Sequence, residues 1–211
     1  MNFDSEQLEA AKAVSEALDS LNIQHAFIGA FASRLMGHDR TCNRVDVGID
    51  ISTYTAVEVS KRLNKHGDLK RARGQLLYLP EDWEEESQVP IEITPLWPLV
   101  DSRTPRVIEV RGVTVLHPAI HVLMDVNLCV QYIGSTSPLS IYRLHQGLSD
   151  TEFQLQWLKQ HNEKIDFSGY QSDRDTVKDL VDHWRTKNRR DLVDLLDSVL
   201  QPEDSERIMQ V

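Results

Sequence analysis

The sequence predicts an α/β N-terminal half, in which helices flank a sheet, followed by an all-helical C-terminal half. Between residues 1 and 117, stretches with helical spacing of apolar residues alternate with short runs rich in β-branched and apolar residues. From Pro118 onward only helical spacing recurs, and no repeat or low-complexity tract interrupts the chain. We therefore expect an α/β domain at residues 1–117 and a helical domain at residues 118–211.

The first half opens with an amphipathic helix, whose apolar residues recur at helical spacing from Leu8 to Leu21. Asp4 with Gln7 three residues later forms a capping-box pattern at its start. The run 25–31, HAFIGAF, predicts a strand that breaks at Gly29 into a second helix, and Gly37 is a natural helix end.

Residues 44–51, RVDVGIDI, predict a strand with two different faces, because successive side chains point to opposite sides of a sheet. One face is apolar, and the other carries Arg44, Asp46, Gly48 and Asp50. A helix follows over 54–67. Four β-rich runs come next, at 75–80, 89–96, 106–110 and 113–117, and the acidic segment 81–87 predicts a solvated hairpin loop.

The second half predicts helices over 119–133, 148–161 and 172–200. Pro118 stands where a first-turn proline belongs, and Pro202 ends the last long helical stretch.

Composition excludes several classes of function. With 23 basic and 33 acidic residues the net charge is −10, which disfavours nucleic-acid binding. The apolar runs are shorter than the roughly 18 residues of a membrane span, and the acidic N-terminus matches neither a secretory signal nor a transit peptide. Two cysteines exclude a disulfide framework or a zinc cluster, so we expect a cytoplasmic protein. The sequence leaves the oligomeric state open.

The stretch 25–50, HAFIGAFASRLMGHDRTCNRVDVGID, is the most informative part of the chain. A strand ends in glycine, a short helix follows, and an Arg-Thr pair precedes a strand with alternate polar residues. This resembles the minimal nucleotidyltransferase fold, the superfamily related to DNA polymerase β. The resemblance implies a mixed sheet flanked by helices, and an acidic site on its strands. Two carboxylates at i and i+2 of one strand, with a third from a later strand, would hold divalent cations for phosphoryl transfer.

Several residues depart from the pattern that the resemblance implies. When Asp46 takes the second acidic position, the first falls on Arg44, and Ala30 stands in place of the second glycine. Glu92, in VPIEI, is the intact third carboxylate. Arg44 stays protonated at physiological pH, so it repels Mg²⁺ and is expected to pair with Asp46 or Glu92. We therefore expect the fold to persist with a degenerate site that holds no metal.

The leading hypothesis is a metal-independent enzyme that acts on a small molecule and is repurposed from a nucleotidyltransferase fold. A cyclase or cycloaddition catalyst of secondary metabolism, acting on a reactive apolar substrate, fits a site that polarises one carbonyl and needs no cofactor. A cleft at the junction of the two halves would be the usual place for such a site. The candidate catalytic residues are Arg44, Asp46 and Glu92, and the candidate substrate-binding residues are Gly29, Ala30, Ser33, Arg40, Tyr78 and Trp97.

Alternatives remain open at this point. The chain could be an active nucleotidyltransferase that uses Mg²⁺ and a nucleoside triphosphate, or a non-catalytic pseudoenzyme that binds a partner. Arg40 could anchor its own loop without contacting a ligand. Tyr78 and Trp97 could pack against other side chains without lining a pocket. Asp50 is expected to serve a cap or a turn.

Overall fold

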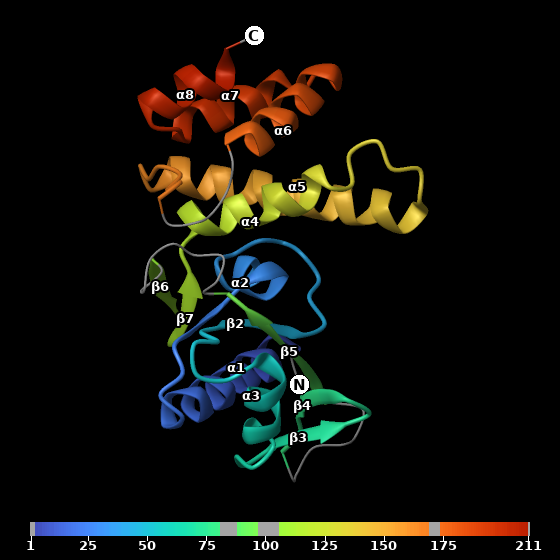
Figure 1. The fold of residues 1–211 in the computed structure, drawn as a ribbon, viewed down its shortest axis with the longest axis vertical. Coiled ribbons are helices and arrows are strands. Elements are labelled where there is room, and N and C mark those ends of the chain that lie inside the picture. The colour runs from blue at the N-terminus through green and yellow to red at the C-terminus, as the bar shows by residue number, and fades with distance from the viewer. Residues whose placement is uncertain (1–2, 81–87, 97–105, 169–173, 211) are drawn as a thin grey trace. The chain divides into compact units, whose positions relative to one another are not determined.

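The computed structural model describes residues 3–80, 88–96, 106–168 and 174–210. The chain divides into two compact units, Met1–Leu116 and His117–Val211. The first unit holds a sheet with three helices, and the second holds only helices among its described residues (Figure 1). The α/β class of the N-terminal half and the helical class of the C-terminal half are thus confirmed.

The sheet of the first unit has seven strands in the order β3-β4-β5-β2-β1-β7-β6. It is mixed, because β2 pairs in parallel with β5 and β1 with β7, whereas the other neighbours are antiparallel. The strands are β1 (His25–Phe27), β2 (Val45–Ile49), β3 (Leu69–Ala72), β4 (Gln75–Tyr78), β5 (Val89–Pro95), β6 (Val107–Val110) and β7 (Val113–Leu116).

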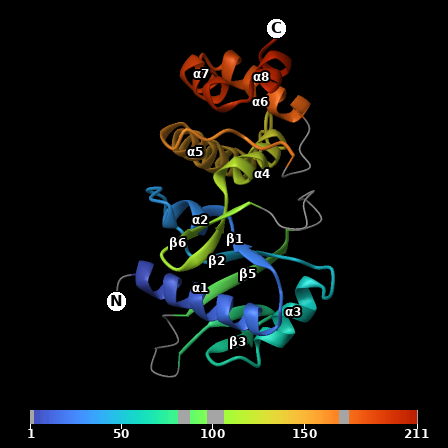
Figure 2. The ribbon, with the colours of Figure 1, turned by 90° about the vertical axis from the view of Figure 1, so that its left-hand side faces the viewer.

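Three helices flank this sheet: α1 (Phe3–Ser20), α2 (Gly29–Leu35) and α3 (Ala56–Leu63). Figure 2 shows α1 on one side of the sheet and α2 on the other. The apolar residues of α1 share one buried core with Val45, Val47 and Ile49 of β2, which are all fully buried. The opposite face of β2, which carries Asp46, therefore lies on the side of the sheet away from α1.

The start of α3 shows how local sequence sets an element boundary. Thr55 is the N-cap, where its hydroxyl oxygen accepts from the backbone N–H of Glu58 at 3.3 Å. The Glu58 carboxylate accepts in return from the Thr55 backbone N–H at 2.9 Å. This reciprocal pair is a capping box, and it begins the helix two residues inside the predicted range 54–67.

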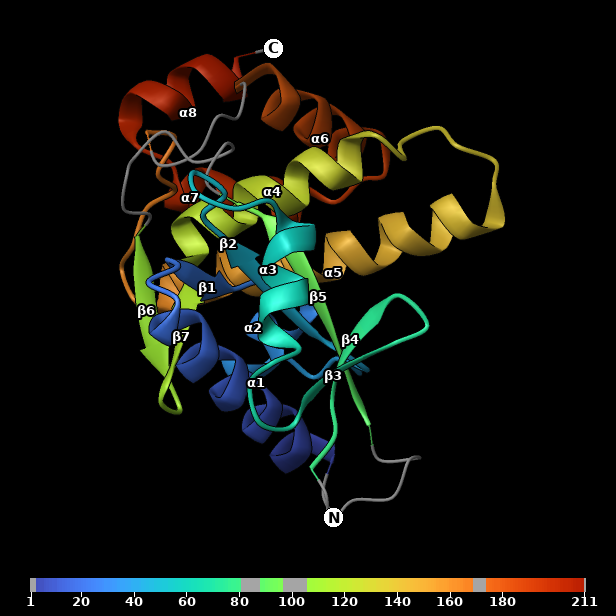
Figure 3. The same ribbon diagram turned by 60° about the horizontal axis from the view of Figure 1, so that its bottom comes forward.

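The second unit contains α4 (Pro118–Val130), α5 (Pro138–Gln160), α6 (Arg174–Thr186), α7 (Arg190–Val199) and α8 (Pro202–Met209). Helices α4 and α5 form an antiparallel hairpin, against which α6 and α7 pack (Figures 1 and 3). His117 caps α4, because its Nδ1 accepts from the backbone N–H of Ala119 at 3.0 Å. No helix in the described ranges combines the length and the apolar character that a membrane crossing requires.

Two helical predictions in the second unit were wrong in extent. The range 148–161 is the last part of a helix that begins at Pro138, and the range 172–200 is two helices. The break falls at Asn188, whose φ of 56° lies in the left-handed region that no helix interior adopts. Pro202 begins α8 at its first turn, where a missing N–H costs nothing. The predicted loop 81–87 lies outside the described residues.

Candidate functional site

Asp46 and Glu92 lie side by side on neighbouring strands. In the parallel β2–β5 pair their Cα atoms are direct partners, so both side chains leave the same face of the sheet. Asp46 is buried and Glu92 is exposed. The structure therefore places one buried and one accessible carboxylate together, on the face away from α1.

The turn between β1 and α2 lies directly against Asp46. The backbone N–H of Ile28 donates to the carbonyl oxygen of Asp46 at 3.0 Å. Gly29 has a φ of 66°, and a Cβ placed on it would come within 3.3 Å of Asp46 Oδ2. Gly29 is thus required by its left-handed backbone and by the close approach of the carboxylate.

Arg44 forms an ion pair with Asp46. Its Nε lies 2.7 Å from Asp46 Oδ1, and the Arg44 side chain is 51% exposed while that of Asp46 is 12% exposed. One edge of the guanidinium is therefore committed to the buried carboxylate, and half of the side chain remains accessible to solvent. An accessible guanidinium edge can donate hydrogen bonds to a carbonyl, carboxylate or phosphate oxygen.

The electrostatic balance at Asp46 is dominated by its burial. Desolvation raises the pKa of Asp46 above its ordinary value, because the charged form loses hydration. The charge and hydrogen bond of Arg44 act in the opposite direction, the nearby Glu92 raises this pKa, and Arg40 lowers it. Arg44 is therefore the main group that offsets the cost of burying the Asp46 carboxylate.

These residues do not fit a two-metal site. On the Asp46 face of β2 the neighbours at two-residue spacing are Arg44 and Gly48, and neither is an acid. A Cβ on Gly48 would meet Leu96 at 2.8 Å, so no carboxylate fits there without displacing the fully buried Leu96. Among the described residues, no group of three His, Cys, Asp or Glu is placed to hold a metal ion. The sequence pattern did not identify the Gly48–Leu96 contact, because nothing in the residue types signals that packing.

Three further candidate residues, Ala30, Ser33 and Arg40, lie in α2 or in the loop that follows it. Ala30 is half-buried at the second position of α2, and Ser33 is fully buried within that helix. The carbonyl oxygen of Arg40 accepts from Arg34 Nη1 at 2.8 Å, while the positive charge of Arg40 acts on Asp46. The backbone of Arg40 thus helps to fix the loop, and its side-chain charge lowers the pKa of Asp46.

Tyr78 is not brought together with the two acids. It pairs with Val89 across the β4–β5 ladder, and Val89 lies an odd number of residues from Glu92. Tyr78 therefore points to the opposite face of the sheet, where it is 8% exposed within the core. Trp97 lies outside the described residues. Asp50 serves a turn as expected, since its carboxylate accepts from the backbone N–H and the hydroxyl of Ser52.

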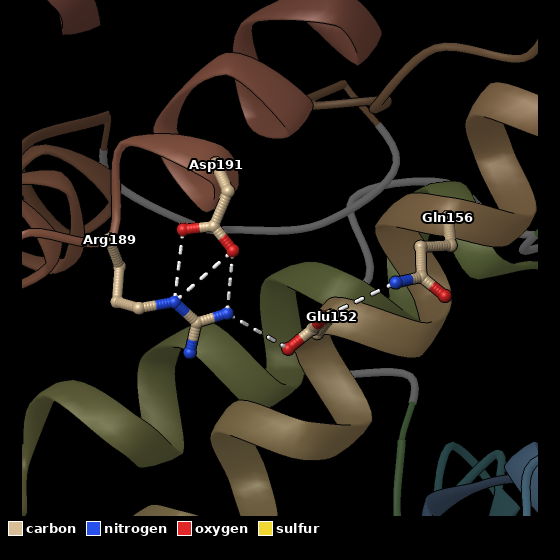
Figure 4. Close-up of polar contacts among 4 residues, drawn as sticks. All are labelled: Glu152, Gln156, Arg189 and Asp191. Carbon is tan, nitrogen blue, oxygen red and sulfur yellow. Dashed lines mark hydrogen bonds and ion pairs between the residues drawn. The ribbon is translucent and has the colours of Figure 1, made fainter.

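A polar groove of about 400 Å³ runs between α5 and α7 in the second unit. At its edge Arg189 donates to the Asp191 carboxylate through Nη2 at 2.8 Å, and the same nitrogen lies 3.5 Å from Glu152 Oε2 (Figure 4). Gln156 donates to Glu152 at 3.3 Å. These are exposed contacts among the groove's own side chains, and we assign them no part in the chemistry of the site on β2.

Comparisons with known proteins bear on the fold. No family model matches the sequence, and no curated protein matches it. A crystal structure of an antigenic nucleotidyltransferase-like protein from Paracoccidioides brasiliensis superposes with a TM-score of 0.67 at 19% identity, covering 93% of this chain and 94% of that one. At this identity the likeness concerns the fold, and it extends through both units. The chain therefore has the nucleotidyltransferase-like fold that residues 25–50 predicted.

Proposed function

We propose that this protein is a metal-independent enzyme, repurposed from a nucleotidyltransferase-like fold, that acts on a small organic molecule. The observation that carries the proposal is the 2.7 Å ion pair between Arg44 and Asp46. The resemblance to nucleotidyltransferases implies that a metal-binding carboxylate would stand in place of Arg44. A cation on a buried carboxylate takes the electrostatic place of Mg²⁺. It excludes the divalent ion by charge repulsion, and it leaves a donor that needs no metal.

Arg44 is the electrophilic group in this proposal. Asp46 holds one edge of the guanidinium, so the exposed edge is oriented before the substrate arrives and can stabilise negative charge that develops on a carbonyl oxygen. Glu92, exposed beside Asp46, can accept a hydrogen bond or a proton from the same substrate. Such a pair of donor and acceptor suits cyclisation, cycloaddition or isomerisation of a reactive apolar intermediate, as in secondary metabolism.

The net charge and the cysteines of the chain support a small-molecule substrate and a reducing compartment. A net charge of −10 favours a small-molecule substrate over a nucleic acid. Cys42 and Cys129 are both free and buried, and we propose a reducing, cytoplasmic location on that basis.

The first test is a calorimetric titration of the wild type with ATP, GTP, CTP and UTP, each with and without Mg²⁺. Ligands that bind the folded state raise its stability, by about 2.7 kcal/mol at a hundred times the dissociation constant. We expect no Mg²⁺-dependent binding and no nucleotidyl transfer. Mg²⁺-dependent stabilisation by any one nucleotide would refute metal independence and support an active nucleotidyltransferase.

The second test asks whether Arg44 is the residue that prevents Mg²⁺ binding and that binds the substrate. Arg44→Asp restores an acid two residues before Asp46, and it is expected to gain Mg²⁺ affinity that the wild type lacks. The wild type and Arg44→Gln are then screened by thermal shift against apolar carbonyl compounds, with Arg189→Gln as a control at an exposed ion pair in the other unit. Compounds that stabilise the wild type and Arg189→Gln but not Arg44→Gln support the proposal. Hits that bind all three proteins equally would contradict the role of Arg44.

A further inference from the structure

The first half of α5 has no buried residue. The buried side chains of this 23-residue helix are Asp150, Thr151, Gln154, Leu155 and Leu158, all in its second half. Yet the twelve residues before them, Pro138–Ser149, include five large apolar side chains: Leu139, Ile141, Tyr142, Leu144 and Leu148. A helix of such length is marginal in water unless an apolar face is packed. The first half of α5 therefore has no fully buried apolar face, although it contacts α4.

Exposed apolar side chains concentrate at this end of the hairpin. Six large apolar side chains are exposed among the described residues, and four of them belong to α4 or the start of α5: Leu128 (51%), Leu139 (57%), Ile141 (39%) and Tyr142 (62%). The other two are Val57 and Val107, which lie in the first unit. Single exposed apolar residues are ordinary, but Leu139 and Tyr142 are three residues apart and share one face of α5, and such a pair on an uncovered helix indicates an interaction surface.

The rest of the helical unit packs elsewhere. Figures 1 and 3 show the connecting end of the α4–α5 hairpin extending beyond α6, α7 and α8. At Gly147 the two hairpin helices lie so close that an added Cβ would meet Cys129 Sγ at 2.5 Å. The hairpin is thus tightly closed on itself there, and its outward-facing apolar residues remain uncovered.

The charge of this surface argues for a particular occupant. Between Asp125 and Asp150 the sequence has 24 residues, of which Arg143 alone is charged, in a chain with 33 acidic residues and a net charge of −10. Arg143 donates to the Tyr132 hydroxyl at 3.3 Å. A strongly charged partner would find no complementary charge here. Two copies of this acidic chain, however, can meet at this surface without bringing carboxylates together.

We propose that residues 126–149 form a two-fold interface with a second copy of this chain. Apart from Val126 and Cys129, the 22 remaining residues of this segment are exposed or half-buried. Interfaces of standard size use about 20–30 residues from each partner, and this segment alone offers accessible residues approaching that number. Two hairpins related by a two-fold axis would pack as a four-helix arrangement, in which Leu139 and Tyr142 of each copy become buried.

The test is sedimentation velocity of the full chain at concentrations from about 1 to about 100 μM. This range covers dissociation constants at the weak end of those found for interfaces of standard size. The wild type is expected to reach twice the chain mass, and Tyr142→Glu to raise the dissociation constant at least about thirtyfold, since the charge enters a two-fold interface twice. Val57→Glu, at a position that is 59% exposed on α3, is the matched control and should dimerise like the wild type.

Hydrogen exchange of residues 138–149 provides a readout that needs no variant. Protection of this segment is expected to rise with protein concentration, while protection of the sheet stays constant. A wild type that remains at one chain mass throughout the range, or a dimer that Tyr142→Glu leaves intact, would overturn the proposal. Equal weakening by Val57→Glu would also overturn it, because the interface would then lie elsewhere or the effect would be one of net charge.

Discussion

The ion pair at the centre of the site allows a quantitative prediction for Arg44→Gln. Two unit charges about 4 Å apart attract by about 4 kcal/mol at the effective dielectric of a protein surface. Arg44 is half exposed, and solvent screening reduces such a pair toward the 0–1 kcal/mol of surface ion pairs. Asp46 is buried, however, and leaving a buried polar group without its partner costs about 1–3 kcal/mol. We therefore expect Arg44→Gln to lose about 1–3 kcal/mol of unfolding free energy at pH 7.

The pH dependence of the stability of Arg44→Gln distinguishes the loss of the ion pair from a packing defect. The pKa of Asp46 is already raised in the folded protein, and removing Arg44 raises it further. The folded variant then binds a proton more readily than its unfolded chain, so its stability improves as pH falls through the folded-state pKa. The deficit of Arg44→Gln is expected to be full near pH 8 and to shrink as pH falls through the raised folded-state pKa of Asp46, because a protonated carboxyl no longer needs the charge of Arg44.

Urea unfolding at several pH values measures this deficit. Because the chain has two compact units, hydrogen exchange of β2 identifies which transition belongs to the sheet. Arg189→Gln removes an arginine from an exposed pair, and it should show a much smaller effect (Figure 4). A deficit for Arg44→Gln below about 0.5 kcal/mol at pH 7 would refute the coupling of Arg44 and Asp46. So would a deficit that stays constant from pH 8 to pH 4.

Three further predictions concern packing and buried titratable groups. Gly48→Ala should lose about 1–3 kcal/mol by overpacking against Leu96, and this penalty should largely vanish in a Leu96→Ala background; additive losses in urea unfolding would contradict the contact. Burial lowers the pKa of His121 despite Asp125, so protonation favours the unfolded chain and stability should fall as pH drops below about 6.5; His121→Gln should flatten that slope in thermal melts. Burial raises the pKa of Cys129 to about 12, so its thiol should resist iodoacetamide at pH 8 until the protein unfolds, as mass spectrometry of the alkylated residue would report.

The sequence was most informative where one pattern decided the structure. Alternation in residues 44–51 predicted the two faces of β2, and the structure buries Val45, Val47 and Ile49 in the core while Asp46 leaves the other face. Gly29 was predicted as the point where a strand passes into a helix, and α2 begins there. These predictions succeeded because the side-chain period of a strand and the left-handed φ of a glycine are local properties.

The sequence was least informative where the deciding contact was distant along the chain. Tyr78 follows a strand near Glu92 in sequence, but the register of the β4–β5 ladder turns it to the opposite face. The helix predicted over 148–161 begins at Pro138 instead and runs through Gly147, which lies against Cys129 where an added Cβ would come within 2.5 Å of Sγ. Strand register and helix contacts of this kind are set by tertiary packing, and single-sequence patterns do not encode them.

The parallel pairing of β1 with β7 affects how the protein folds during synthesis. Phe27 pairs with Val115, so the two strands are separated by 115 − 27 = 88 residues. β1 lies between β2 and β7 in the sheet, and one of its edges has no partner until the ribosome has delivered residue 116. Each helix of the second unit, in contrast, makes its main contacts with helices at most two elements away in the chain. The turn that contacts Asp46 follows β1, so it is attached to a strand whose pairing is completed late. A nascent chain truncated before β7 would leave one edge of β1 unpaired and prone to aggregation.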